Sequence, residues 1–142
     1  MPAPADKPRL SKPERITLPT VLLRHLAPAE NGGEHYDWMM VDPRTADDAN
    51  ARLWTARVTQ PSSRWASLRE WDVEMIGTHR REYLTYEGPV SGNRGTVTRV
   101  DEGTFVAVSW TEERIEIEIG FKHYAGRVVM TRQSPTRWRA VI

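Results

Sequence analysis

The chain has 142 residues, a formal net charge of +1 at pH 7 and no cysteine. This length suits one domain with a substantial hydrophobic core. The absence of cysteine excludes disulfides, thiolate zinc sites and cysteine nucleophiles, and no run of about 18 apolar residues predicts a membrane span. The first residues lack a basic segment followed by an apolar one, so a secretory signal is not expected and a cytoplasmic location is.

The N-terminal segment differs in composition from the rest of the chain. Its first 17 residues contain four prolines and few large apolar side chains. Such a segment cannot bury enough apolar surface to offset its ordering entropy. We therefore expect a flexible or extended arm over 1–17, which we class as disordered, and a single globular domain over 18–142.

Short apolar stretches predict three strands in the first half of the domain. They cover Val21–Leu23, Glu34–Val41 and Arg52–Val58. The stretch 45–52 has some helical character but fits a loop equally well. No strand is assigned between Val58 and Gly95.

The second half has a strong β pattern. The segments 95–100 and 104–108 flank Asp101-Glu102-Gly103, which predicts a hairpin with a glycine-containing turn. Ile115, Ile117 and Ile119 alternate with charged residues, the period of a half-buried strand. Two further strands are expected at 127–131 and 137–142.

Many short strands with frequent turn signals indicate an all-β protein. A small closed or nearly closed antiparallel β-barrel fits this pattern, and a sandwich is the alternative. The six tryptophans are expected in the core or at its rim, with Trp65 or Trp71 the candidate for an exposed one. His123 lies near a predicted turn and is interpreted as a surface residue.

The histidines supply the main functional signal. His35 and Asp37 are two residues apart, so on a strand both side chains leave the same face. Imidazole and carboxylate groups that converge on one point suit a divalent metal of borderline or hard preference. Taken alone, Asp37 could equally orient a histidine or cap a turn.

The order of these residues resembles a known family. His25 is followed by His35-Tyr36-Asp37, then by His79, Tyr83 and Glu87-Gly88. Closing strands with the Gly126-Arg127 step and the terminal Trp138-Arg139-Ala140-Val141-Ile142 complete the match. Over about residues 19–142 the chain resembles the 3′-phosphoesterase domain of bacterial DNA ligase D and the related stand-alone proteins.

This resemblance implies a small β-barrel enzyme that depends on manganese, with other divalent metals possible. The family removes a terminal ribonucleoside or a 3′-phosphate from nucleic-acid ends, including primer-template DNA, during DNA repair by end joining. By motif, His25, His35 and Asp37 are the expected metal ligands. His79 is the expected catalytic residue, either contacting the phosphate or transferring a proton.

The resemblance gives further residues lesser roles. Tyr83 and Glu87 occupy motif positions and are assigned supporting roles. A separate ligase or polymerase is an expected partner, a membrane is not, and the protein is expected to be a monomer.

Some polar positions of the family are changed in this chain. Met39, Met75 and Gly77 stand where the family has an arginine, an arginine and an acidic residue. The candidates to replace these phosphate contacts are the nearby arginines Arg57, Arg80, Arg81 and Arg94. Ser91–Gly95 is glycine-rich and is predicted to be a turn that borders the site.

These changes leave two other functions open. One is a non-catalytic module that binds metal or nucleic acid and has kept the barrel. The other is a related phosphoesterase that acts on another small substrate. Metal binding and DNA binding without turnover would distinguish the first from an enzyme.

Overall fold

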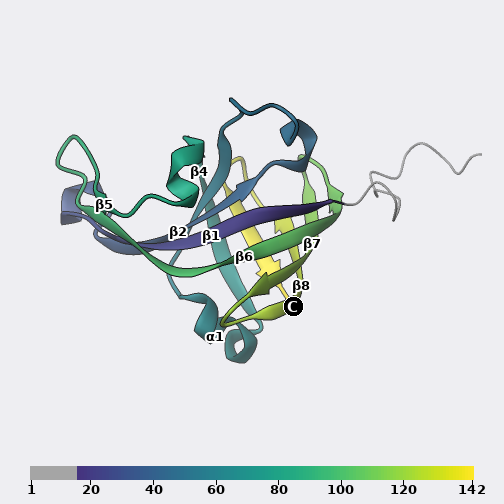
Figure 1. Cartoon of the computed structure of the whole chain (residues 1–142). Helices are drawn as coiled ribbons and strands as arrows, with labels where there is room; N and C mark the ends of the chain where they lie inside the picture. Colours follow the sequence, from purple (N-terminus) through teal and green to yellow (C-terminus); the bar gives the residue numbers. More distant parts are fainter. Residues whose placement is uncertain (1–15) are drawn as a thin grey trace, which may run out of the picture.

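The computed structural model describes residues 16–142 and shows an antiparallel sheet closed into a barrel (Figure 1). Eight strands close the barrel and a ninth, very short strand extends it. The strands are β1 Thr17–Leu26, β2 Glu34–Val41, β3 Leu53–Val58, β4 Glu70–His79, β5 Gly88–Pro89, β6 Thr96–Trp110, β7 Arg114–Phe121, β8 Ala125–Arg132 and β9 Arg137–Val141. The helices are α1 Ser62–Leu68 and three 3₁₀ turns, η2 Ala29–Asn31, η3 Pro43–Thr45 and η4 Arg81–Leu84.

The strand order explains the closure. Neighbours run β1-β2-β3-β4-β9-β8-β7-β6-β5, and β1 also pairs with β6. This confirms the predicted barrel over the sandwich. The predicted arm over 1–17 falls almost wholly outside the described residues, and β1 begins at Thr17.

The barrel interior is filled by alternating strand residues and by tryptophans. Ile115, Ile117 and Ile119 are each at most 3% exposed, as their alternation predicts. Trp65 is fully buried and stacks on Trp71 with ring centroids 4.6 Å apart. The expectation that one of these two tryptophans is exposed was wrong, because α1 carries Trp65 into the core, where its Nε1 donates to Gln60 O.

The predicted hairpin around residues 101–103 was also wrong, since β6 runs without a turn from Thr96 to Trp110. Gly103 instead allows β6 and β7 to lie close together, because a Cβ at this position would lie 1.8 Å from Gly120 O on β7. The Asp101 carboxylate accepts hydrogen bonds from other segments, including the backbone N–H groups of Lys122 and His123. The residues that resemble a turn thus contact β7 and the turn that follows it.

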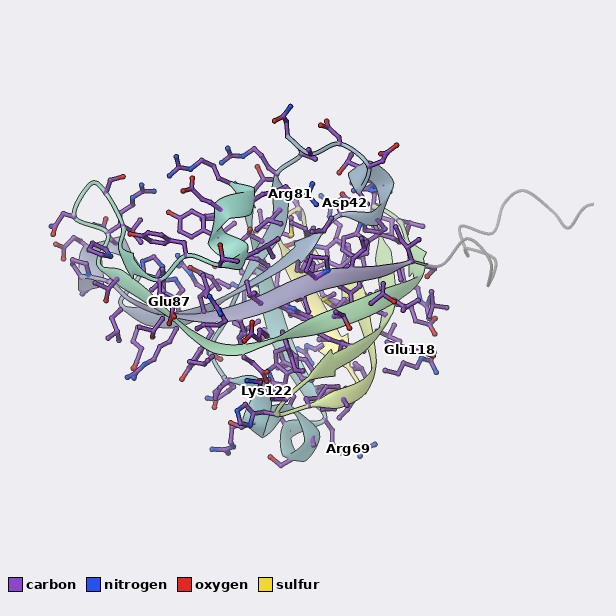
Figure 2. All side chains as sticks on the ribbon, in the orientation of Figure 1. Asp42, Arg69, Arg81, Glu87, Glu118 and Lys122 are labelled. Atoms are coloured by element: carbon purple, nitrogen blue, oxygen red, sulfur yellow. The ribbon has the colours of Figure 1, made fainter. Side chains whose placement is uncertain are left out.

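Other elements match the predictions unevenly. β2 has the predicted bounds, while β4 and α1 were not predicted. The ambiguous stretch 45–52 consists of the end of η3 and turns, and His123 is exposed as expected. Charged side chains such as Arg69, Glu118 and Lys122 point outward around the barrel (Figure 2). No helix among residues 16–142 has both the length and the apolar composition needed to cross a membrane.

A β-bulge in β4 sets which side chains face outward near its end. Arg57 pairs with Glu74 and Leu53 pairs with His79, so five steps along β4 match four along β3. The extra residue lies near Gly77, whose φ of +103° is a left-handed conformation that favours glycine. Because directly paired residues share a face, the bulge brings His79 to the same face as Arg57.

Candidate metal and phosphate site

The two strands β1 and β2 bring the predicted metal ligands together on the outer face of the barrel. Trp38 points inward, with its indole 4.8 Å from that of Trp65, so its neighbour Asp37 points outward. His25 pairs directly with His35, and their rings are 4.7 Å apart. The ligand atoms of His25, His35 and Asp37 all lie within 4.8 Å of one another.

The carboxylate of Asp37 lies between the two imidazoles. His25 Nδ1 is 2.9 Å from Asp37 Oδ2, and His35 Nε2 is 3.1 Å from Asp37 Oδ1. The second pair of atoms is buried but makes no hydrogen bond. His35 Nδ1 faces Gly33 O at 3.2 Å, which leaves Nε2 as the ligand nitrogen.

This arrangement fits a divalent metal. Metal–ligand bonds of about 2.1 Å place neighbouring ligand atoms roughly 3.0–3.4 Å apart. The close, unbonded His35 Nε2 and Asp37 Oδ1 have this spacing. Two imidazoles and one carboxylate suit Mn²⁺, Fe²⁺ or Zn²⁺ and do not select one of them.

The charge state of the triad follows from its contacts. Burial raises the pKa of Asp37, but the hydrogen bond with His25 and the close approach of the His35 imidazole outweigh it and lower the pKa to about 2. The hydrogen bond to Asp37 raises the pKa of His25 against the opposing effect of burial, and Arg94 O, 2.6 Å from Nε2, adds to the rise. Asp37 is therefore ionised at neutral pH, and a metal competes with protons at His25.

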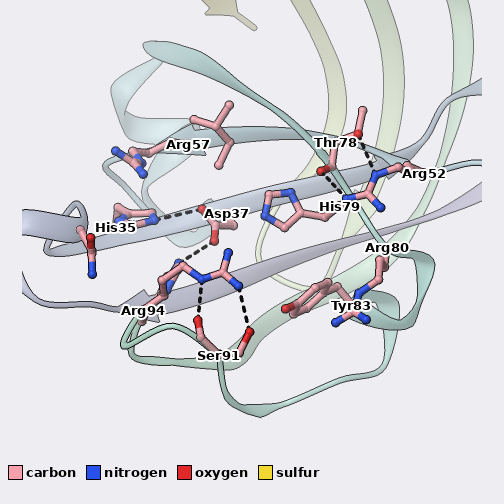
Figure 3. Close-up of a pocket in the computed structure, with 13 residues that line it drawn as sticks. His35, Asp37, Arg52, Arg57, Thr78, His79, Arg80, Tyr83, Ser91 and Arg94 are labelled. Atoms are coloured by element: carbon pink, nitrogen blue, oxygen red, sulfur yellow. Dashed lines mark hydrogen bonds and ion pairs between the residues drawn. The ribbon is translucent and has the colours of Figure 1, made fainter.

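His79 lies on the same outer face and points toward Asp37 (Figure 3). Its Nδ1 is buried without a hydrogen-bond partner, and its ring packs edge-on against Tyr83 at 5.7 Å. Burial lowers the pKa of His79, so the imidazole is neutral at pH 7. A neutral imidazole with an unused nitrogen can accept a proton or hydrogen-bond to a ligand.

Arginines surround the triad within a cavity of about 690 Å³. Arg52, Arg57, Arg80 and Arg94 line it, and Asp37 is the single acidic residue that residues 16–142 contribute to it. Arg52 donates to Thr78, and Arg94 donates to Ser91 (Figure 3). These acceptors are neutral, so they fix the guanidinium groups without cancelling their charge. The cavity therefore attracts an anion.

Arg57 has the least compensated charge of this group. Its Nε is buried without a hydrogen-bond partner, and no carboxylate in the described chain forms an ion pair with it. It lies beside His35 above Gly32, where a Cβ would be 3.1 Å from Arg57 Nη2 and 3.2 Å from His35 Cε1. A glycine at position 32 thus leaves room for both side chains.

The remaining predicted residues divide between the cavity and other places. The cavity is lined by Tyr83, Arg80, Arg94 and Ser91, and the Ser91–Gly95 turn borders it. Glu87 does not line it: its carboxylate accepts from the Arg99 backbone N–H and ties the segment after η4 to β6. Its supporting role is therefore structural.

Sequence reasoning missed one cationic residue, Arg52. It stands immediately before Leu53, the cross-strand partner of His79. The sequence did not indicate that Arg52 lies near His79, because β4, and with it the β3–β4 register, was not predicted. Arg81, considered as a phosphate contact, instead donates to Asp48 O and does not line the cavity.

The structure accounts for the non-polar residues at the changed family positions. Met39 is 1% exposed and belongs to the hydrophobic core. Met75 packs against the core from β4. Gly77 forms the bulge that orients His79.

A substitution at Gly95 tests the link between the turn and the triad. A Cβ at Gly95 would lie 1.7 Å from Leu26 O, so Gly95→Ala must displace the turn from the end of β1. We expect Arg94 O to move away from His25 and the protein to lose about 2–4 kcal/mol of stability. Thermal denaturation and the His25 NMR resonances measure both effects.

Gly92→Ala is the matched control. Gly92 also has a positive φ, +75°, but the atom nearest to a Cβ at this position would be Arg94 Nε, at 3.6 Å. This variant carries the backbone strain without the clash and is expected to lose about 1 kcal/mol. Equal losses of stability in the two variants would show that the close approach of Gly95 to Leu26 O has no effect on stability.

Comparison with known proteins adds no family to this description. No protein-family model matches the chain, and no curated protein matches it.

Proposed function

We propose that the protein is a divalent-metal-dependent phosphoesterase that processes 3′ ends of nucleic acid in DNA repair, removing a 3′-phosphate or a terminal ribonucleoside. The observation that carries this proposal is the shared cavity, in which His25, His35 and Asp37 lie beside His79 and four arginines. The resemblance of the motif order to the ligase D phosphoesterase domain supports the same class of substrate.

The side chains have distinct tasks in this reaction. Arg52, Arg57 and Arg94 bind the phosphoryl oxygens and stabilise the charge that develops on them. When bound, a cation such as Mn²⁺ supplies Lewis acidity at the phosphate. Water attacks the phosphorus as the ester oxygen leaves. The neutral His79 imidazole accepts a proton from that water or hydrogen-bonds the phosphate, and Tyr83 supports the His79 ring.

The test is turnover by the purified protein with Mn²⁺. Oligonucleotides that end in a 3′-phosphate or a single ribonucleotide are expected to be converted to 3′-hydroxyl ends. His79→Ala is expected to lower the rate by about 10²–10⁴-fold while Mn²⁺ still binds. Failure of the wild-type protein to process either end with Mn²⁺, Co²⁺, Zn²⁺ or Mg²⁺ would rule out the proposed phosphoesterase activity.

A second candidate is a non-catalytic module that binds metal and nucleic-acid ends. The burial of Met39 favours it, because no guanidinium projects from that position of β2. Saturable Mn²⁺-dependent binding of a 3′-phosphorylated oligonucleotide, combined with no turnover, would select this candidate over the phosphoesterase.

A further inference from the structure

A second cavity adjoins the site along the outer face of β3 and β4. It has a volume of about 360 Å³, at the lower end of the range for small-ligand pockets. Arg57 lines both cavities. A ligand held at the triad can therefore extend past Arg57 without leaving the protein surface.

The sheet register places charged side chains in a row that connects the two cavities. Asp37 pairs with Arg57, Arg57 with Glu74, and Glu74 with Arg137, across β2, β3, β4 and β9. Paired residues share a face and lie about 5 Å apart. The row therefore leads from the metal ligands directly into the second cavity.

The second cavity has a different character from the first. Leu68 gives it an apolar wall, to which Trp71, only 7% exposed, adds a small area, whereas Glu74, Arg57 and Arg137 give it acceptors and donors. None of these three charged side chains forms an ion pair with any residue from 16 to 142. They remain free to bind a ligand.

The charges in this cavity nearly balance. Its other two carboxylates, Glu70 and Asp72, are held by Arg139 at 3.4 and 3.0 Å. With Arg139 included, three basic groups meet three acidic ones. A phosphate gains little in such a place, but a flat, neutral ring with both donors and acceptors on its edge is well matched.

We propose that this second cavity binds the nucleobase of the nucleotide that carries the reacting 3′ phosphate, an inference that rests on the proposed function. The base lies against Leu68 and the small exposed part of Trp71. Glu74 accepts hydrogen bonds from an exocyclic amine, and Arg137 donates to ring nitrogens or carbonyl oxygens. Arg57, between the cavities, contacts the phosphate.

The experiment measures binding without turnover. The probe is a fluorescent hexanucleotide whose 3′ end carries a phosphonomethyl group, which resists hydrolysis because carbon replaces the bridging oxygen. One version has adenine on the terminal nucleotide, and the other is abasic there. With Mn²⁺ present, we expect the adenine probe to bind the wild-type protein about tenfold more tightly.

Variants locate the source of this preference. Glu74→Ala and Arg137→Ala are each expected to reduce the tenfold ratio to less than about threefold. Arg64→Ala is the matched control, because Arg64 is an exposed arginine on α1 that lines neither cavity, and it is expected to keep the ratio. Melting temperatures check that all three variants are folded.

The outcomes separate this inference from the proposed function. Equal affinity of the wild-type protein for the two probes would overturn the nucleobase site and leave the phosphate site intact. A tenfold ratio that survives in both cavity variants would also overturn it. If neither probe binds at all, the proposed function fails and the inference fails with it.

Discussion

Replacing Asp37 with alanine is expected to weaken Mn²⁺ binding by more than about 100-fold and to abolish any metal-dependent turnover. Within the described part of the chain Asp37 is the single carboxylate that lines the cavity, and its two oxygens face different histidines at 2.9 and 3.1 Å. Loss of a residue that merely orients a metal ligand costs 10- to 100-fold in affinity, so loss of a direct ligand costs at least as much.

Isothermal titration with Mn²⁺ measures this effect. Asp37 is 2% exposed, so Asp37→Asn, which keeps the shape of the side chain, is the companion variant for the case in which alanine disturbs the fold. Asp47→Ala is the matched control, since Asp47 is exposed and does not line the cavity. Unchanged Mn²⁺ affinity in a folded Asp37 variant would eliminate the triad as a metal site.

Asp101→Ala is expected to destabilise the barrel by about 3–5 kcal/mol, which corresponds to a fall of roughly 10–20 °C in Tm. The Asp101 carboxylate is 2% exposed and accepts from the Ser62 hydroxyl at 2.6 Å and from backbone N–H groups of β6 and the β7–β8 turn at 2.8–3.0 Å. Alanine leaves the buried Ser62 hydroxyl and three part-buried backbone N–H groups without their acceptor.

Chemical and thermal denaturation test this expectation, with Glu102→Ala as the neighbouring control. Glu102 is exposed, and its contact with Arg99 at 3.3 Å is a surface ion pair, so its removal is expected to change stability by less than about 1 kcal/mol. Similar Tm values for the Asp101 and Glu102 variants would contradict the role given to Asp101.

The barrel was predictable because most strands carry a plain apolar pattern. β2 matched its predicted bounds, and the alternating isoleucines of β7 point inward. β4 was missed because its outer face is acidic at Glu70, Asp72 and Glu74, where the pairing arginines of other strands are unknown from sequence. The false hairpin in β6 arose because Gly103 marks close strand contact, which has the same local signature as a turn.

The candidate site was predictable to a similar extent. His25, His35 and Asp37 were identified from spacing and motif order, and they do lie together. Arg52 and the second cavity were not identified, because both depend on which strands pair and in which register. Side chains that meet only through tertiary pairing leave no local pattern.

The bulge in β4 makes the cavity sensitive to the number of residues in that strand. The segment of β4 from Glu74 to His79 is one residue longer than the segment of β3 with which it pairs, Leu53 to Arg57. His79 points outward only because of this extra residue. A one-codon deletion there would keep every functional residue type and still turn the imidazole into the barrel. Relatives of this chain that share all four site residues but differ by one residue in this interval are therefore not equivalent to it in function.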